Sequence, residues 1–229
     1  MLKLIAMIAM VIDHIAVAFL PASPLYLYAR LIGRLAMPIF AYKIACGFLY
    51  THNLKRYALN IALMTLAAQI PFTLLNDAGP FAKEVLTHWN IGVTFLCALG
   101  VLALLNSSKP IPLLLRAFTL LILFFVASYA DYGLYGLAMV LIFYYCITHH
   151  TSLYLCLLSL GILTILYYAV SMPSLATYMI NMQLPALLAV PLIYYVPDHK
   201  MKWGKSFFYI FYPLHMLILV VLQHFIGLF

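Results

Sequence analysis

Long apolar runs alternate along the chain with short polar or proline-marked breaks, and this pattern predicts helices. About 20 apolar residues in a helix cross the roughly 30 Å hydrocarbon core of a membrane. We therefore predict an all-α, polytopic transmembrane bundle of about nine helices, with residues 1–229 forming a single transmembrane domain. The predicted helices lie near residues 2–20, 30–50, 57–76, 90–106, 112–130, 133–148, 151–171, 177–196 and 206–228.

The first apolar run has some features of a signal peptide. Lys3 precedes it and Pro21-Ala22-Ser23 follows it. Asp13-His14, however, interrupts the part of a signal peptide that should be purely apolar. We expect a retained first helix.

Composition supports a membrane protein and excludes several classes of function. Of the 229 residues, 67% are hydrophobic and 7% are charged, whereas about a quarter are charged in soluble domains. A nine-helix bundle uses the whole chain, so a separate soluble catalytic, nucleotide-binding or DNA-binding domain is excluded. The cysteines lie in apolar runs without metal-like spacing and are expected to be small core residues: Cys46, Cys97, Cys146 and Cys156.

The net charge of +7 bears on orientation rather than on nucleic-acid binding, which we do not expect. With nine crossings, most basic residues fall on one face of the membrane. By the positive-inside rule this face and the N-terminus are cytoplasmic, in the cell inner membrane. The basic residues of this face are Lys3, Lys55, Arg56, Lys109, His149, His150, Lys200, Lys202 and Lys205, with Arg116 slightly inside the fifth predicted helix.

Several polar residues fall at membrane depth, where an ionisable group costs roughly 2.5–3.5 kcal/mol. At about 1.5 Å per residue, Asp13, His14 and Arg34 lie at similar depth in the outer half. We predict a buried polar cavity that holds a reactive site. The alternative is that these polar residues only join neighbouring helices through hydrogen bonds and ion pairs, with Arg34–Asp13 or Arg34–Asp131 as a structural ion pair. The other polar residues at this depth are Gln69, Asn90, Thr94, Asp131, Tyr132 and Gln183, with His215 nearer the middle.

His14 is the candidate for acid–base chemistry, because a histidine takes and returns protons near neutral pH. Asp13 points about 100° away around the helix, so either Asp13 or Asp131 is a candidate to orient the imidazole. Arg34 is a candidate to balance a carboxylate or to stabilise an oxyanion, the latter together with Asn90 or Tyr132. His14 and His215 lack the short spacing of metal ligands, and we expect no metal site.

Four blocks of sequence, in order along the chain, resemble the TraX family of integral membrane proteins, named for a member implicated in N-terminal acetylation of F-type conjugative pilin. They start at Ile5, Arg30, Asp131 and Phe208, and they read IAMIAMVIDH, RLIGRLAMPIFAY (running on to Gly47-Phe48), DYGLYG and FYIFYPLH.

The same blocks also resemble acyltransferase-3 type membrane acyltransferases, which carry a histidine in the first helix and a Gly-Lys-Ser-aromatic…Tyr-x-x-His last helix. Here Gly204-Lys205-Ser206-Phe207 precedes Tyr212-Pro213-Leu214-His215, although this chain is shorter by about a helix. The resemblance implies an acyltransferase of the N-acetyltransferase type with His14 as catalytic residue and acetyl-CoA as donor substrate, and no permanently bound cofactor. His14 then either acts as general base or holds the acyl group itself.

The expected partners are acyl-CoA, membrane lipid, and an acceptor that bears an amine or hydroxyl, such as a peptide N-terminus, a glycan or a small molecule. The competing functions are a proton- or ion-coupled transporter and a non-catalytic membrane assembly factor. The candidates are His14, Asp13, Arg34, Asp131, Tyr132 and His215 for catalysis; Lys55, Arg56, Lys200, Lys202 and Lys205 for the phosphates of acyl-CoA; and Gln69, Asn90, Thr94 and Gln183 for the acceptor.

Overall fold

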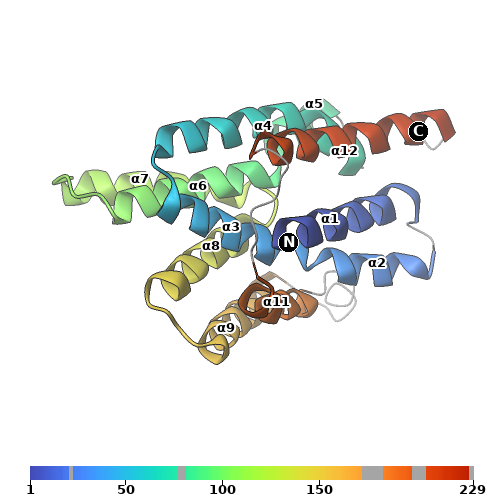
Figure 1. Cartoon of the computed structure of the whole chain (residues 1–229). Coiled ribbons are helices and arrows are strands. Elements are labelled where there is room, and N and C mark those ends of the chain that lie inside the picture. The colour runs from blue at the N-terminus through green and yellow to red at the C-terminus, as the bar shows by residue number, and fades with distance from the viewer. Residues whose placement is uncertain (21–22, 77–80, 172–182, 198–204, 227–229) are drawn as a thin grey trace.

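The computed structural model describes residues 1–20, 23–76, 81–171, 183–197 and 205–226. The described residues form helices and their connections, which confirms the all-α prediction, and Trp89 and Ala130 pair as an isolated β-bridge. The elements are α1 (Leu2–Phe19), α2 (Leu25–Gly33), α3 (Ala36–Tyr50), α4 (Leu54–Asn76), α5 (Phe81–Thr87), α6 (Ile91–Leu105), α7 (Leu113–Ser128), α8 (Gly133–Thr148), α9 (Leu153–Ser171), the 3-10 helix η1 (Leu184–Leu188), α11 (Ala189–Tyr195) and α12 (Lys205–Ile226), as Figure 1 shows.

Among the described residues, five helical segments are long and apolar enough to span a membrane. They are Leu2–Phe19, Leu25–Tyr50, Leu54–Asn76, Leu153–Val170 and Phe207–Ile226. Four shorter apolar helices, Ile91–Leu105, Leu113–Ser128, Gly133–Thr148 and Leu184–Tyr195, occupy other predicted segments. At about 1.5 Å per residue these are shorter than the hydrocarbon core. The helices fit a multi-pass membrane protein, whereas the count of nine crossings and the single domain over residues 1–229 stay predictions.

The second predicted helix differs from the structure at its start and in its middle. It begins at Leu25 rather than near residue 30, and α2 ends at Gly33 before α3 begins at Ala36. Pro38 has no amide hydrogen to bond the carbonyl of Arg34, and its ring crowds that carbonyl. This proline accounts for a kink at Arg34 and Leu35, where the backbone keeps nearly helical angles. Arg34 lies at this interruption and is buried.

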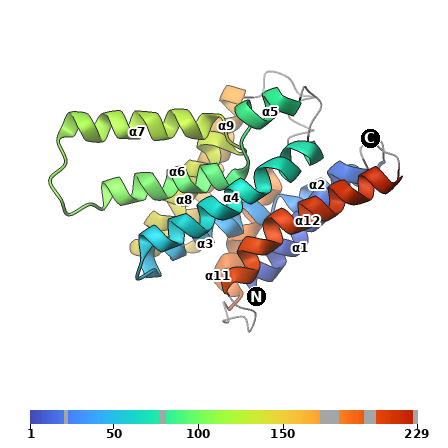
Figure 2. The same cartoon turned by 90° about the horizontal axis from the view of Figure 1, so that it is seen from above.

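Helix α3 lies at the centre of the bundle and contacts α1, α6, α8 and α11. Three small residues of α3, Ala36, Ala41 and Ala45, are buried, and small residues let neighbouring helices approach closely. On one side α1 packs against α2, and α4 packs against α12. Figure 2 shows α6 and α7 as an antiparallel pair away from α1 and α12. This arrangement leaves α1, α3, α4 and α12 around a common interior.

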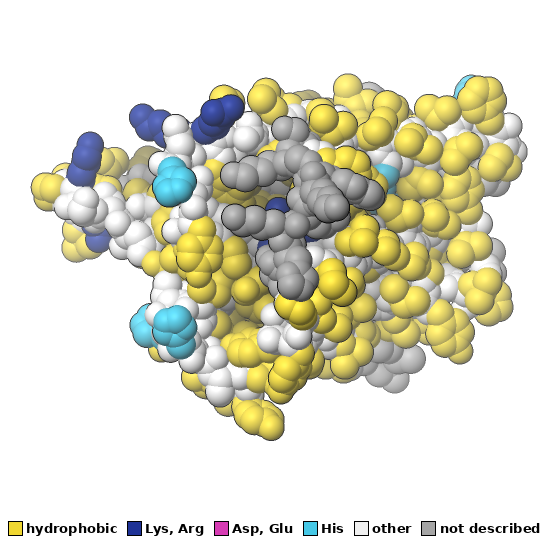
Figure 3. Space-filling view, in the orientation of Figure 1, with side chains coloured by type: hydrophobic (Ala, Val, Ile, Leu, Met, Phe, Trp, Pro, Cys, Tyr) yellow, Lys and Arg dark blue, Asp and Glu magenta, His cyan; other side chains and the backbone are white. Residues whose placement is uncertain are grey.

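The outer surface is apolar and has the character of a lipid-facing surface. Ala127 is the only buried residue of α7, all of which the structure describes, and Leu114 is 84% exposed. Figure 3 shows hydrophobic side chains over most of one face, with Lys, Arg and His gathered at the end where α3 meets α4, α6 meets α7 and α8 meets α9. The exposed members at this end are His52, Lys55, Arg56, Lys109, His149 and His150. We call this the basic end.

Candidate functional site

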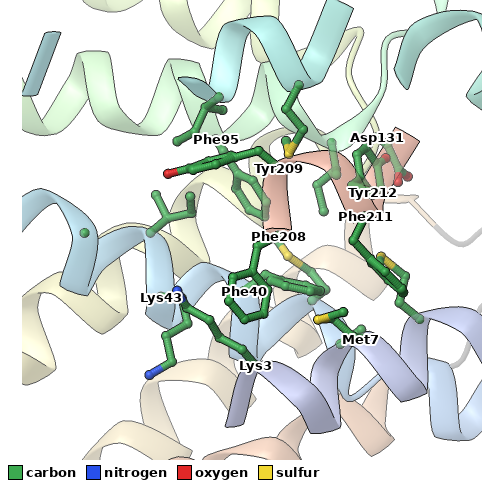
Figure 4. A pocket seen from close by; sticks show the side chains of 18 of the residues that line it. Lys3, Met7, Phe40, Lys43, Phe95, Asp131, Phe208, Tyr209, Phe211 and Tyr212 are labelled. Atoms are coloured by element: carbon green, nitrogen blue, oxygen red, sulfur yellow. The ribbon is translucent and has the colours of Figure 1, made fainter. Parts of the chain in front are cut away.

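A cavity of about 900 Å³ opens among α1, α2, α3, α4, α6 and α12. Its lining follows α4 from Arg56 to Asn76, which is about 30 Å along a helix and matches the thickness of a hydrocarbon core. Lys3 and Lys43 line one side and Asp131 and Tyr212 another, as Figure 4 shows. The volume falls within the usual range for ligand sites, roughly 300–1,000 Å³.

His14 of α1 lines this cavity and is hydrogen-bonded to His215 of α12. His14 Nδ1 lies 2.7 Å from His215 Nε2, and the ring planes are within 5° of parallel with centroids 5.0 Å apart. This geometry fits an in-plane, edge-to-edge bond between two imidazoles. His215 Nδ1 in turn lies 2.9 Å from the carbonyl oxygen of Phe211. From the sequence, either Asp13 or Asp131 is expected to orient His14, but the bonded partner in the structure is His215.

These two contacts fix the tautomers of both rings when they are neutral. The Phe211 carbonyl can only accept, so His215 Nδ1 carries a hydrogen and donates it. His215 Nε2 is then an acceptor, so His14 Nδ1 must be the donor of the bond between the rings. This leaves His14 Nε2 with a lone pair. A histidine held in this tautomer beside a cavity is arranged as a general base, like the histidine of a catalytic triad.

The same two nitrogens do not suit a shared metal ion. Two imidazole nitrogens on one tetrahedral zinc, at about 2.0 Å each from the metal, lie more than about 3 Å apart. The observed 2.7 Å is a hydrogen-bond distance. The described residues contain no group of three or more His, Cys, Asp and Glu side chains able to hold a metal.

Asp13 forms an ion pair with Arg30 rather than with Arg34. Arg30 Nη1 donates to Asp13 Oδ2 at 2.6 Å, between α2 and α1. Asp13 also presses against the backbone of Gly33, where an added Cβ would lie 2.1 Å from Asp13 Oδ1. Asp13 Oδ1 and Arg30 Nε are buried without a hydrogen-bond partner, and both residues line the cavity. The ion pair thus secures α1 against α2 and leaves two polar atoms at the cavity wall.

Arg34 is the buried cation of the site, with 6% of the residue exposed. Its Nη1 donates to the hydroxyl oxygen of Tyr132 at 3.2 Å, and its Nη2 is buried without a partner. Tyr132 occupies a left-handed backbone conformation, φ 60°, just before α8 begins. Asp131 Oδ1 accepts from the Tyr132 amide at 3.0 Å and so holds this turn. Five of the predicted catalytic residues therefore line one cavity: Asp13, His14, Arg34, Asp131 and Tyr132. The sixth, His215, is hydrogen-bonded to His14.

Three of the predicted acceptor contacts lie elsewhere, in a structural network. Asn90 is fully buried, caps α6 by accepting from the Gly92 amide, and donates to the Thr65 carbonyl and to Gln69 Oε1. Gln69 donates to the His88 carbonyl, and Thr94 donates to the Asp131 carbonyl at 2.6 Å. These bonds join α4, α6 and the turn before α8. The predicted substrate contacts of Gln69, Asn90 and Thr94 stay predictions that the proposal below does not use.

The remaining predicted residues divide by position. Gln183 is buried and its backbone N–H donates to the Tyr168 hydroxyl, but the residue does not line the cavity. Of the residues predicted to bind phosphate, Arg56 lines the cavity and Lys55 is exposed outside it. Lys200 and Lys202 lie outside the described residues, as does the side chain of Lys205.

Two charged residues of the cavity were missed by sequence reasoning. Arg30 was placed near a helix end, and Lys43 was not considered, although both line the cavity. Lys43 lies seven residues before the end of α3, so about 10 Å inside it. A lysine at that depth in an apolar helix was the available signal, because such a group needs a polar cavity or a partner.

Comparisons with known proteins agree with the features of the chain. A family model described as TraX protein matches residues 1–223. The chain is 30% identical over 234 residues to a protein from Dichelobacter nodosus named "Probable fimbrial assembly protein FimC, serogroup H1", covering 95% of this chain and 92% of the relative. No solved structure matches. The resemblance to acyltransferase-3 enzymes stays a prediction. Because the family match covers nearly the whole chain, including every block that carries the cavity, this protein belongs to the TraX family.

Proposed function

We propose that this protein is a membrane-embedded acyltransferase that moves an acetyl group from cytoplasmic acetyl-CoA to an amine or hydroxyl of an acceptor. The observation that carries the proposal is the His14–His215 pair, which leaves a lone pair on Nε2 of His14, a residue that lines a cavity about 30 Å long. An acyl transfer needs a base at the nucleophile, donors for an oxyanion and room for two substrates. In the cavity, His14 is the proposed base, Arg34 is the proposed oxyanion donor, and about 900 Å³ of space is available to the substrates.

The proposed chemistry is a direct transfer. His14 Nε2 takes the proton of the acceptor amine or hydroxyl as that group attacks the thioester carbonyl carbon. A C–N or C–O bond forms, the C–S bond breaks, and the thiolate of CoA leaves with the proton returned by His14. While His14 holds the proton, the hydrogen on Nδ1 is shared with His215, which spreads the positive charge over two rings.

Arg34 is the proposed stabiliser of the oxyanion. Its Nη1 is held by the Tyr132 hydroxyl, so the guanidinium has a fixed orientation, and Nη2 remains a donor in a buried site. A donor aimed at developing charge in a water-poor site contributes about 10²–10³ in rate. The ion pair of Asp13 with Arg30 balances part of the positive charge beside it.

The proposed orientation of the protein in the membrane is based on the position of the basic end. Under the positive-inside rule, the end that carries Lys55, Arg56, Lys109 and the two histidines His149 and His150 faces the cytoplasm of the inner membrane. His14 lies eleven residues beyond Lys3 in α1, about 16 Å along the helix from Lys3. Acetyl-CoA then enters from the cytoplasm, and the acceptor reaches His14 from the outer side or laterally from the membrane.

A second candidate is a non-catalytic assembly role, because the relative from Dichelobacter nodosus is named a fimbrial assembly protein. In that case the polar residues tie helices together, as the network of Gln69 and Asn90 does. A transporter is the third candidate, because the cavity lining follows most of the length of α4. Both alternatives predict that acetyl-CoA is not consumed.

The test uses purified full-length protein in liposomes, radiolabelled acetyl-CoA and a membrane extract as the source of acceptor. Wild type should transfer label to an extract component, and His14→Ala should lose at least about 10³-fold of that rate. His149→Ala is the matched control, because His149 is exposed at the basic end outside the cavity, and it should keep the wild-type rate. Equal transfer by His14→Ala, or no acetyl-CoA consumption by well-folded wild type, would contradict the proposal.

A further inference from the structure

Asn60 is a polar residue of the cavity that the proposed transfer step does not use. It lies six residues after Leu54, about 9 Å along α4, and this half-buried residue lines the cavity. No group in the part of the chain that the structure describes forms a hydrogen bond with its side-chain amide. A polar side chain inside an apolar helix needs a partner, because an unsatisfied amide is costly away from bulk water. Asn60 therefore points to a polar ligand in the cavity.

Two tyrosines bring hydroxyl groups to the same part of the cavity. Tyr57 precedes Asn60 by three residues, which places both on one face of α4, and Tyr209 comes from α12. Both tyrosines line the cavity and interact electrostatically with each other, and Figure 4 shows Tyr209 among the side chains of the pocket wall. Neither hydroxyl has a hydrogen-bond partner among the described residues. We call Tyr57, Asn60 and Tyr209 the neutral patch.

Close packing against α3 holds the Tyr57 hydroxyl in place. An added Cβ at Gly47 of α3 would lie 2.2 Å from Tyr57 Oη, so the hydroxyl rests against the backbone of α3. The lack of a side chain at Gly47 makes this approach possible. The position of the Tyr57 hydroxyl in the cavity wall is thus set by the fold.

The chemistry of the neutral patch suits a ligand that carries secondary amides. The side chain of Asn60 offers N–H donors and a carbonyl acceptor, and each tyrosine hydroxyl both donates and accepts. None of the three side chains is a carboxylate or a cation, so the patch itself offers no counter-charge to an ion. A secondary amide is neutral and has one N–H and one C=O, and the patch can satisfy both groups.

The neutral patch lies between the basic end and His14. Tyr57, at the start of α4, interacts with Tyr209 of α12, whereas Met216 of α12 belongs to one buried cluster with Phe72, further along α4. The two helices therefore run in the same direction, away from the basic end, and Figure 2 shows them side by side. A ligand that enters at the basic end passes the neutral patch before it reaches His14.

The distance from the neutral patch to His14 matches the arm of an acyl-CoA. His215, which bonds to His14, lies six residues beyond Tyr209, about 9 Å along α12. In an extended pantetheine arm the two amide nitrogens lie about 4 Å and about 9 Å from the sulfur, at standard bond lengths. With the thioester at His14, the second amide therefore reaches the level of Tyr209.

We propose that Tyr57, Asn60 and Tyr209 bind the secondary amides of the pantetheine arm of acyl-CoA through hydrogen bonds. This inference rests on the proposed function and names residues that orient the thioester toward His14. The backbone of a peptide acceptor carries the same amide chemistry, so the experiment separates the two ligands. The pantetheine arm is favoured because the neutral patch lies on the basic-end side of His14, from which acetyl-CoA is proposed to enter.

The experiment measures binding separately from transfer, by isothermal titration calorimetry on full-length protein in nanodiscs. The probes are CoA, pantetheine, ADP, which lacks the arm, and a blocked dipeptide. Asn60→Leu should weaken the binding of CoA and of pantetheine about tenfold or more, because leucine leaves a bound amide without a partner. Tyr57→Phe and Tyr209→Phe each remove one hydroxyl and should weaken the binding of the same two ligands about 2- to 12-fold. The affinity for ADP should stay at the wild-type value in all three variants.

Tyr154→Phe is the matched control, because Tyr154 is 81% exposed on α9 and lies outside the cavity. It should bind every probe as wild type does. Melting temperature gives an independent readout. Asn60→Leu loses no hydrogen bond to any described residue, so it should melt at or above the wild-type temperature. A clear loss of stability would assign Asn60 to helix contacts and overturn its role as a ligand group.

The outcomes separate the binding site from the proposed reaction. Wild-type pantetheine affinity in Asn60→Leu and Tyr209→Phe, or an equal loss in Tyr154→Phe, would overturn the site and leave the proposed transfer intact. Weaker binding of the dipeptide alone would overturn the assignment to the donor. Pantetheine binding that depends on the neutral patch, without any acetyl transfer, would instead overturn the proposed function and retain the site.

Discussion

Replacing Gly33 with alanine tests the close approach of α1 to the kink between α2 and α3. A Cβ at this position would lie 2.1 Å from Asp13 Oδ1, 2.4 Å from Asp13 Cβ and 2.5 Å from Asp13 Cγ. Real Cβ atoms do not approach so closely, so the Asp13 side chain must move. Because Asp13 Oδ2 lies 2.6 Å from Arg30 Nη1, that movement also strains the ion pair between α1 and α2.

The expected cost combines these two effects. Overpacking costs about 1–3 kcal/mol, and weakening a partly buried ion pair adds about 1–3 kcal/mol, which is less than for a fully buried pair. The higher helix propensity of alanine returns about 1 kcal/mol. The net destabilisation is about 1–5 kcal/mol. For a chain of this size a loss of 1 kcal/mol lowers the melting temperature by about 2–4 °C.

The assay is thermal unfolding of purified protein in one detergent. Gly161→Ala is the matched control, because Gly161 is also helical and an added Cβ there would meet nothing within 4 Å. Gly161→Ala should melt at the wild-type temperature or slightly above it, since alanine favours the helix by about 0.5–1 kcal/mol. A Gly33→Ala protein that melts within about 1 °C of wild type would refute the placement of Asp13 against the α2–α3 kink.

Three further predictions follow from the site. His215→Phe keeps a ring beside Phe211 but removes the partner of His14 Nδ1, and loss of a charge-assisted hydrogen bond worth about 1.5–3 kcal/mol should slow acetyl transfer about 10- to 150-fold. An unchanged rate in steady-state assays would show that His215 does not orient His14. Arg30→Gln leaves the Asp13 carboxylate without its cation and should lower the melting temperature by several degrees, whereas the double variant with Asp13→Asn should recover much of the loss. A double variant no more stable than the single one would argue against the pair. Asn90→Ala removes the cap of α6 and the bonds to Thr65 and Gln69, and should destabilise the protein by about 2–4 kcal/mol in denaturant titrations. Its affinity for CoA should stay at the wild-type value in calorimetry, and a selective loss of CoA binding with normal stability would assign Asn90 to the ligand instead.

The helices and the membrane class were predictable from the sequence, because apolar run length is a local property and lipid leaves the backbone few alternatives to a helix. Position along a helix is a local property in the same way. Asp13, His14 and Arg34 were placed at one level by counting 1.5 Å per residue, and the structure brings all three to one cavity. The kink before α3 was missed although Pro38 is plain in the sequence, since a proline tolerated inside a helix gives no break in hydropathy.

Partner choice within the site was decided only by the tertiary structure. Depth alone did not tell which of Asp13, Asp131 and His215 meets His14, because that depends on how α1 and α12 are rotated against each other. For the same reason Arg30 rather than Arg34 pairs with Asp13, and Lys43 faces the cavity while Lys55 does not. The sequence by itself thus determined which segments form apolar helices and at what level along those helices their polar groups lie. The tertiary structure determined which of those groups face each other, since rotation about each helix axis is set by packing with helices distant in sequence.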